Sequence, residues 1–348
     1  MVVWCIVLVL SIGDHPRVRL VRLPTPIQYM PKLSEELGIE LYIKRDDYME
    51  LAMGGNKARK LEYLLGDALK KNCDTIITVG ALCSNHVRLT AAACRLYNLH
   101  PILILTTTGP KKVKGNLLLD VLFDAEIKIV DVPSSEIPKV LEEVAMEQEA
   151  KGRKPYIIPG GGASKVGVLG YLNASVEILH QLNEMCVRVD YIVHSTGSGG
   201  TQTGLCLGMK NLNSGIKVLG ISCGPSRDLV SNRIKRLAEE SVEYLKLPVK
   251  LDDKDIIVYD EYTCGGYGIV TKDVVEVMRR VAKMEAILLD PLYTGKAFMG
   301  LMDLVDKGVI EKGSKVLFIH TGGLPLIFQY EEDLWRYGIK VSDLEKLA

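Results

Sequence analysis

The stretch RDDYMELAMGGNKARKLEYLL, residues 45–65, joins an expected strand to an expected helix through a turn that contains two adjacent glycines. The strand is ELYIKR at 40–45, and the helix is predicted over 57–71 because leucines recur along one face. Two glycines let a backbone come close to a bulky planar ligand, and a lysine in dry surroundings at a helix start has a lowered amine pKa. Lys57 is therefore a candidate for holding a cofactor through its amine, with an ordinary solvated lysine as the alternative.

The composition describes a folded chain without a global charge preference. The 348 residues suggest about two domains, and 47% hydrophobic with 25% charged residues is typical of a globular protein with a sizeable core. The 43 basic and 43 acidic residues cancel, so nothing favours nucleic acid or an anionic membrane as a partner. We expect a small-molecule partner bound at a local site.

The cysteines and histidines indicate neither a disulfide scaffold nor a metal site. The eight cysteines form no CxxC pair and no ligand cluster with the six histidines, so no metal is expected. Scattered reduced thiols point to the cytoplasm.

The first thirteen residues, MVVWCIVLVLSIG, are apolar. They are too short to span a bilayer, which takes about 20 apolar residues, and they lack the basic region and cleavage site of a secretory signal. We expect a buried strand or helix here, and an upstream-extended start codon is the alternative.

Strands and helices alternate along the rest of the chain, which predicts an α/β fold with parallel sheets covered by helices on both faces. The alternation predicts two doubly wound domains: a small one at 60–168, and a large one made of 1–59 plus 169–348. Such sheets bind ligands at the carboxyl ends of their strands, so the site is expected in the cleft between the domains. The expected strands lie at 75–80, 101–109, 126–130, 191–194, 217–223, 256–259 and 315–320, and the expected helices begin near residues 85, 170, 201, 227, 272 and 295.

The glycine-rich stretch STGSGGTQTG, residues 195–204, runs from a strand end into a helix and is expected to bind phosphate. Gln202 stands where a dinucleotide-binding GxGxxG motif needs glycine, and Leu205 and Cys206 stand where a P-loop needs Lys-Ser/Thr. A phosphate held without a P-loop lysine, together with a separate candidate lysine, suggests a phosphorylated aldehyde; a tight turn without a ligand is the alternative. The expected phosphate ligands are Thr196, Gly197, Ser198, Gly199, Gly200 and Thr201.

From about Pro16 onward the chain resembles pyridoxal-phosphate enzymes of the tryptophan-synthase-β fold (fold type II), in the group of D-cysteine desulfhydrases and 1-aminocyclopropane-1-carboxylate (ACC) deaminases. The resemblance rests on TPIQYMPKLS, IKRDD, GGNKARKLEYLLGDAL, SNH, GSGGT, DPLYTGKAF and HTGG. It implies that Lys57 forms the Schiff base with pyridoxal 5'-phosphate, that the GSGGT loop binds the phosphate, and that the protein is a homodimer. Lys60 is expected either to assist at the phosphate or to be a surface lysine.

The resemblance also implies roles for the remaining site residues. Ser84, Asn85 and His86 begin a helix whose free N–H groups suit a substrate carboxylate, although Ser84 and Asn85 also fit ordinary N-capping and His86 fits structural packing. Asn85 would contact the phenolic oxygen of the cofactor, and Ser84 would lie near the reacting carbon. Thr321 would face the pyridine nitrogen, and the hydroxyls of Tyr267 and Tyr293 would approach the substrate unless they only pack in the core.

Two departures from the ACC deaminase pattern guide the choice of reaction. ACC deaminases have glutamate after the tyrosine of DPxY and glutamine after Ser-Asn, whereas Thr294 and His86 stand here. A hydroxyl at the ring nitrogen makes a moderate electron sink, which suits β-elimination of a good leaving group. We therefore expect a D-cysteine desulfhydrase-like lyase in which Lys57 removes the Cα proton and hydrolysis yields pyruvate and ammonia. The alternatives are an ACC deaminase-like homologue or a cysteate sulfo-lyase and, more remotely, a non-catalytic pyridoxal-phosphate-binding protein or an NAD-dependent α/β enzyme.

Overall fold

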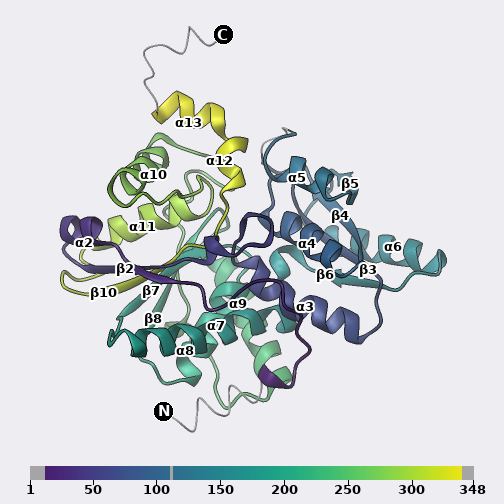
Figure 1. Ribbon diagram of the computed structural model, residues 1–348, viewed down its shortest axis with the longest axis horizontal. Coiled ribbons are helices and arrows are strands. Elements are labelled where there is room, and N and C mark those ends of the chain that lie inside the picture. Colours follow the sequence, from purple (N-terminus) through teal and green to yellow (C-terminus); the bar gives the residue numbers. More distant parts are fainter. Residues whose placement is uncertain (1–11, 110–112, 339–348) are drawn as a thin grey trace.

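Two separate β-sheets organise the protein in the computed structural model, which describes residues 12–109 and 113–338 (Figure 1). The strand or helix expected within residues 1–13 falls almost entirely outside the described residues. In the part of the chain that the structure describes, no helix is long and apolar enough to cross a membrane.

The large sheet has six strands in the order β1-β2-β10-β7-β8-β9. Its strands are parallel except β1, which pairs antiparallel with β2 at the edge. The sequence alternation predicted the parallel strands, but it did not predict the antiparallel edge strand β1. The strands are β1 (Ile27–Tyr29), β2 (Glu40–Lys44), β7 (Tyr191–Thr196), β8 (Lys217–Ser222), β9 (Ile257–Tyr259) and β10 (Lys315–Ile319).

Helices cover both faces of the large sheet. One core joins α2, α10 and α11 to the sheet, and includes Phe298 packed edge-on against Phe318 with ring centroids 5.0 Å apart. A second core packs α7 and α8 on the opposite face, and α9 lies beside them (Figure 1). These helices are α2 (Pro31–Leu37), α7 (Lys165–Glu184), α8 (Gly200–Asn211), α9 (Arg227–Leu245), α10 (Lys272–Glu285) and α11 (Thr294–Asp306); α12 (Pro325–Gln329) and α13 (Glu331–Gly338) follow β10.

The small sheet has four parallel strands in the order β5-β4-β3-β6. Helix α6 packs on one face, and α4 and α5 pack on the other. The sequence analysis did not anticipate β6, a four-residue strand that follows a short charged segment. The elements are α3 (Lys57–Lys70), β3 (Thr75–Ala81), α4 (Asn85–Leu96), β4 (His100–Thr106), α5 (Asn116–Leu122), β5 (Glu126–Val130), α6 (Ile137–Ala150) and β6 (Pro155–Ile158); short 3₁₀ turns lie at Asp46–Tyr48, Leu51–Met53, Gly160–Gly162 and Asp253–Asp255.

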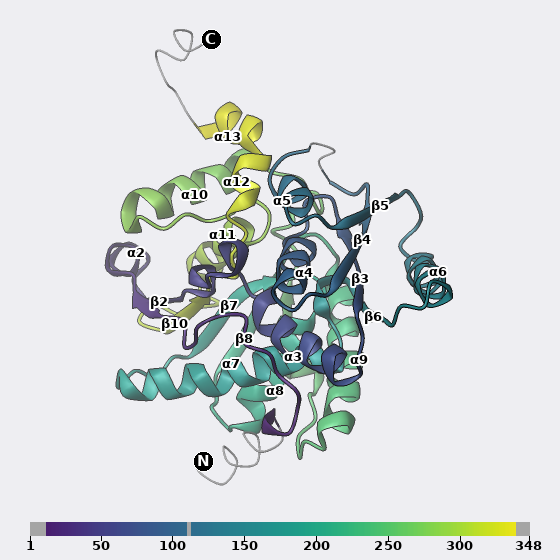
Figure 2. The same ribbon diagram turned by 45° about the vertical axis from the view of Figure 1, so that its right-hand side comes forward.

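Helices α3 and α7 lie between the two sheets and pack directly on each other (Figure 2). A Cβ on Gly170 would stand 2.5 Å from the carbonyl oxygen of Arg59, so only glycine allows this backbone contact. The division at 59/60 and 168/169, proposed from the sequence, falls inside these two helices and stays a prediction.

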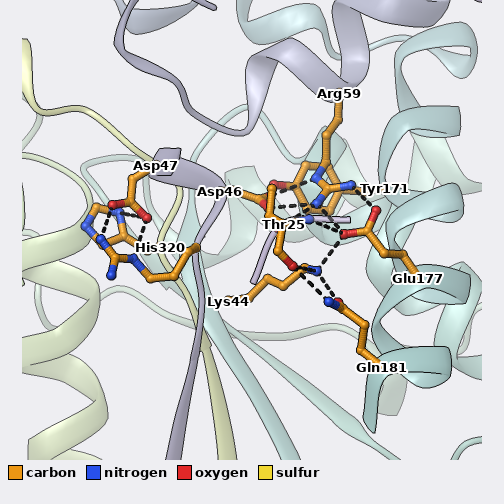
Figure 3. A network of polar contacts seen from close by, with 10 residues as sticks. Thr25, Lys44, Asp46, Asp47, Arg59, Tyr171, Glu177, Gln181 and His320 are labelled. Atoms are coloured by element: carbon orange, nitrogen blue, oxygen red, sulfur yellow. Dashed lines mark hydrogen bonds and ion pairs between the residues drawn. The ribbon is translucent and has the colours of Figure 1, made fainter. Parts of the chain in front are cut away.

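A buried ionic network anchors the first turn of α3 to the large sheet and α7 (Figure 3). Arg59 donates to both carboxylate oxygens of Asp46, at 2.9 and 2.8 Å, and to both oxygens of Glu177 at 2.8 Å. Lys44 donates to the same Glu177 at 2.5 Å, and the Tyr171 hydroxyl donates to Asp46 at 2.5 Å. The network therefore holds the helix that begins with Lys57 at a set place relative to β2.

Candidate active site

The candidate site lies where strands of both sheets end. Thr196 ends β7 and Thr321 follows β10 in the large sheet, whereas Ser84 follows β3 and Gly160 follows β6 in the small one. The carboxyl ends of both sheets thus meet beside the start of α3, the location expected for a ligand in this architecture.

The Gly54–Lys57 turn contacts the end of the large sheet on two sides. The Asn56 N–H donates to the Thr321 carbonyl at 3.1 Å, and the Asn56 amide donates to the Thr201 hydroxyl at 2.9 Å. A Cβ on Gly55 would lie 2.9 Å from the Thr321 carbonyl oxygen. The glycine therefore allows the turn to come close to another segment of backbone, that of Thr321.

Lys57 is the first residue of α3 and stays partly exposed. Burial of its amine lowers the pKa from 10.5 to about 8, against the opposing effects of Cys223 and a hydrogen bond with Lys60. A Cβ on Gly161 would lie 3.7 Å from Lys57 Nζ and 2.5 Å from Ser198 Oγ, which places both groups beside the turn after β6. The amine is therefore close to the glycine-rich loop and has a substantial unprotonated fraction near neutral pH.

Lys60 is buried, with 1% exposure, so the surface-lysine alternative is wrong. Its Nζ donates to the Gly161 carbonyl at 3.2 Å and lies 3.0 Å from where a Cβ on Gly200 would stand. Burial first, and then the neighbouring charge of Lys57, hold the Lys60 pKa well below its usual value. Two adjacent buried amines at the glycine-rich loop form a site that an anion would stabilise.

The glycine-rich loop carries hydrogen-bond donors that the protein itself does not use. Gly200 begins α8, and Gly199 before it has φ 87°, a conformation that favours glycine. Ser195 Oγ and Thr196 Oγ1 are buried and have no hydrogen-bond partner among the residues that the structure describes. Thr201 Oγ1 accepts from Asn56, so its hydroxyl hydrogen is free to donate. These hydroxyls and the helix N-terminus fit a phosphate group.

Ser84 caps α4, because its hydroxyl accepts from the Val87 N–H at 3.3 Å. The capping alternative is therefore correct for Ser84, and it leaves the first N–H groups of α4 without partners inside the helix. Capping and carboxylate binding are compatible at such a helix start.

His86 is buried and neutral. Thr78 Oγ1 donates to the Ile158 carbonyl at 2.8 Å, so it must accept from His86 Nε2 at 2.8 Å, which places the ring hydrogen on Nε2. Burial first, and then Lys57 and Lys60, hold the His86 pKa well below its usual value. Its Nδ1 is a buried acceptor that no described residue contacts with a hydrogen bond. The imidazole therefore links α4 to Thr78 of β3, whose hydroxyl in turn bonds the end of β6, and this supports the packing alternative.

Tyr267 and Tyr293 form a hydroxyl pair 2.6 Å apart, with the rings edge-on at 6.1 Å. The Cys83 sulfur lies 3.7 Å from the Tyr267 hydroxyl, and burial raises the pKa of both tyrosines well above the usual value. Cys223 affects the pKa of both tyrosines and of Lys57, so the tyrosine pair and the Lys57 amine both lie near this thiol.

Lys296 was not predicted as a site residue, although it holds the loop before Tyr267 in place. Its buried amine donates to three carbonyls, those of Cys223, Thr263 and Gly266, at 3.2, 2.7 and 2.9 Å. These acceptors are main-chain carbonyls far from Lys296 in the sequence, so no side-chain motif could predict the contacts.

The Thr294 hydroxyl is fully committed to Asp290. It donates to the Asp290 carboxylate at 2.6 Å and accepts from the Asp290 N–H at 2.8 Å. The same carboxylate accepts the N–H groups of Leu292, Tyr293 and Thr294 at the start of α11. Thr294 therefore stabilises the turn that contains Tyr293, and its hydroxyl is not available to a ligand in the site.

Known proteins resemble this chain over most of its length. The family model described as "Pyridoxal-phosphate dependent enzyme" matches residues 18–322. A protein of Pyrococcus abyssi, named as a candidate 1-aminocyclopropane-1-carboxylate deaminase, is 48% identical over 93% of this chain and 96% of its own length. A D-cysteine desulfhydrase of Salmonella typhi is 40% identical over 90% of this chain and 96% of its own length. The crystal structure of an ACC deaminase homologue superposes with a TM-score of 0.88 at 45% identity, covering 95% of this chain and 98% of that one.

Proposed function

Because the chain belongs to the family of pyridoxal-phosphate-dependent enzymes, we propose that it is a lyase that converts D-cysteine and water into pyruvate, ammonia and hydrogen sulfide. The family membership removes an NAD-dependent α/β enzyme from the candidates. The choice among substrates rests on the arrangement of the site residues.

Named residues fit each part of the cofactor. The amine of Lys57 would bind the aldehyde carbon, and residues 196–201 together with Lys60 would hold the phosphate, because the buried Thr196 hydroxyl has no partner among the described residues and the buried Lys60 amine lies beside Gly200. Thr321 would face the pyridine nitrogen, and Asn85 the phenolic oxygen. When bound, the cofactor withdraws electrons from the substrate Cα and so weakens the bonds at that carbon.

Lys57 is the proposed base for the Cα proton. Its pKa of about 8 leaves part of the amine unprotonated at neutral pH, and the residue lies close enough to both sheets to reach a substrate between them. When its amine is free, Lys57 would take the Cα proton and hold it.

The tyrosine pair is the proposed proton source for the leaving sulfur. One hydroxyl of Tyr267 and Tyr293 donates to the other, and the arrangement leaves a hydroxyl hydrogen for a third group. Their raised pKa values keep both hydroxyls protonated before the reaction. The substrate carboxylate would lie at the start of α4, on the free N–H groups around Ser84, Asn85 and His86.

The observation that carries the choice of β-elimination is the bond between Thr294 and Asp290. An ACC deaminase has glutamate at this place, whereas the Thr294 hydroxyl is occupied within the turn and cannot protonate the ring. The remaining hydroxyl at Thr321 makes a moderate electron sink, which suffices to expel sulfide but suits the opening of an unactivated cyclopropane poorly.

The test is to assay the purified protein with D-cysteine, L-cysteine, D-serine, cysteate and ACC while sulfide, sulfite, pyruvate and ammonia are recorded. We expect sulfide and pyruvate in equal amounts from D-cysteine. Lys57→Ala should lose both the visible cofactor band and pyruvate release, whereas Lys71→Ala, at the exposed end of the same helix, should keep both. Sulfite from cysteate as the main product would overturn the choice of substrate, and a fully active Lys57→Ala would overturn the mechanism.

An ACC deaminase-like activity is the second candidate, because the relative with 48% identity carries that name. Ammonia release from ACC without any sulfide from D-cysteine would favour it. A cofactor band with no turnover of any of the five compounds would instead indicate a non-catalytic pyridoxal-phosphate-binding protein.

We also propose a cytoplasmic homodimer, on the basis of the family resemblance and the reduced cysteines. The final step is a hydrolysis, since the three-carbon enamine released after sulfide loss takes up water to give pyruvate and ammonia. Sedimentation analysis would test the dimer.

A further inference from the structure

A buried arginine, Arg88, lies one turn after Asn85 on α4 and is fully shielded from solvent. Its guanidinium donates to the amide oxygen of Asn116 at 3.0 Å, to the amide oxygen of Asn85 at 3.4 Å and to the Gly54 carbonyl at 2.8 Å. One side chain therefore joins the start of α4, the start of α5 and the glycine turn before Lys57.

These contacts determine how the Asn85 amide is oriented. A guanidinium has only donors, so the amide oxygen of Asn85 must face Arg88. The Asn116 amide nitrogen donates to this same oxygen at 2.8 Å and to the Cys83 carbonyl at 2.7 Å, while its own oxygen accepts from Arg88. The Asn85 amide nitrogen is consequently turned away from the network, and within the described part of the chain neither of its N–H groups has a partner, so both can bind a ligand.

The charge of Arg88 is not neutralised by a contact. Its polar partners within residues 12–109 and 113–338 are all uncharged groups, and its Nε has no partner. Asp120 is the acidic group that acts on it, but burial raises the Asp120 pKa to about 8, so this carboxyl is mostly protonated at neutral pH. Burial lowers the Arg88 pKa to about 10, which still leaves the guanidinium charged. A positive charge therefore remains behind the Asn85 amide.

We infer that Arg88 and Asn116 are positioning residues that turn the Asn85 N–H groups toward the phenolic oxygen of the bound cofactor and favour the ionised form of that oxygen. The inference rests on the proposed function only in placing the pyridoxal ring beside Asn85. A hydrogen bond whose acceptor is ionised is stronger than one between neutral groups. The orientation of the Asn85 N–H groups and the positive charge of Arg88 therefore both favour the ionised phenolic oxygen.

The experiment measures cofactor binding by the apoprotein, without turnover. Dissociation constants are determined for pyridoxal phosphate and for 3-deoxypyridoxal phosphate, which lacks the phenolic oxygen, with the wild type, Arg88→Gln, Asn116→Ala, Asn85→Ala and the double variant Asn85→Ala/Arg88→Gln. Arg95→Gln, an exposed arginine on the same helix, is the matched control. Asn116→Ala supplies the second variant should Arg88→Gln fail to fold.

We expect Arg88→Gln and Asn116→Ala to bind pyridoxal phosphate about tenfold more weakly, the order expected for one charge-assisted hydrogen bond, and to bind the 3-deoxy analogue like the wild type. The visible band should lose intensity to the near-ultraviolet band, and Arg88→Gln should have no further effect in the Asn85→Ala background. Equal weakening for both ligands, or full additivity in the double variant, would overturn the inference, because Arg88 would then serve only the fold. Absence of D-cysteine turnover would overturn the proposed substrate and leave these binding results unaffected.

Discussion

Lys57 and Lys60 illustrate how burial changes the chemistry of a common residue. They are three positions apart, so both side chains lie on one face of the first turn of α3. Burial is the first cause of the lowered pKa in each, and their proximity lowers the pKa of Lys60 further. Nucleophilic chemistry at neutral pH requires an amine with a lowered pKa, and here the surroundings of the lysine lower it.

The lowered pKa of Lys57 predicts how cofactor capture depends on pH. In the apoprotein, the rate at which the visible band forms should rise as pH increases through about 8 and level off above it, because the deprotonated amine is the reactive form. Stopped-flow absorbance between about pH 6 and about pH 10 checks this. A rate that keeps rising through the 10.5 of an ordinary lysine would contradict it, and Lys57→Ala should show no band at any pH.

Helix α3 depends on charges that burial would otherwise make unfavourable. Burial alone would raise the pKa of Asp46, but Arg59, Lys44 and Tyr171 together lower it, and the pKa of Glu177 is lowered in the same way. A carboxylate with a lowered pKa in the folded state stabilises the fold at pH values above its unfolded pKa. That stabilisation is lost as pH falls through the folded value.

Removal of Arg59 should therefore destabilise the protein strongly. Arg59→Met leaves Asp46 as a buried charge without its main partner, which is expected to lower the free energy of unfolding by about 3–5 kcal/mol at neutral pH. Urea denaturation at about pH 7 and about pH 3 checks both the size and the sign, since the difference between wild type and variant should shrink in acid as the carboxylates become protonated.

The matched control is Arg22→Met. Arg22 pairs with Glu50 while its side chain is 97% exposed, so its loss should cost less than about 1 kcal/mol. Equal effects of the two substitutions would contradict the role given to the buried network.

At the scale of the whole molecule, the candidate site draws residues from both sheets. Its residues follow strands of the large sheet at Thr196 and Thr321 and strands of the small sheet at Ser84 and Gly160. A ligand that contacts both groups of residues would tie the two halves together in addition to occupying the site.

Bound pyridoxal phosphate should accordingly raise the thermal stability of the protein. At a concentration of about 100 times the dissociation constant, the expected gain is about 2.7 kcal/mol, which corresponds to several degrees in Tm. Differential scanning calorimetry of the apo and loaded protein measures it. Inorganic phosphate, which would engage only residues 196–201 and Lys60, should give a smaller shift, and a Tm unchanged by the cofactor would contradict the site.

Local pattern was sufficient to predict most elements and the chemical character of several segments. Helix α9 and strand β5 occupy the residues predicted for them, because long amphipathic or β-branched runs carry a clear periodicity. The short β1 and β6 were missed, whereas the equally short β9 was predicted at 256–259; strands of this length form only when a neighbour supplies the hydrogen bonds.

By itself, the sequence determined the α/β class, the family and Lys57 as a candidate amine at a glycine turn, since each depends on residues close together in the chain. Only the tertiary structure decided that Lys60 is buried, that Thr294 is occupied by Asp290, that His86 carries its hydrogen on Nε2 and that Arg88 faces the Asn85 amide oxygen. Protonation, tautomer and amide orientation depend on burial and on partners such as Ile158 and Asn116, which are distant in sequence and reach His86 and Asn85 only when the small sheet and its helices have folded.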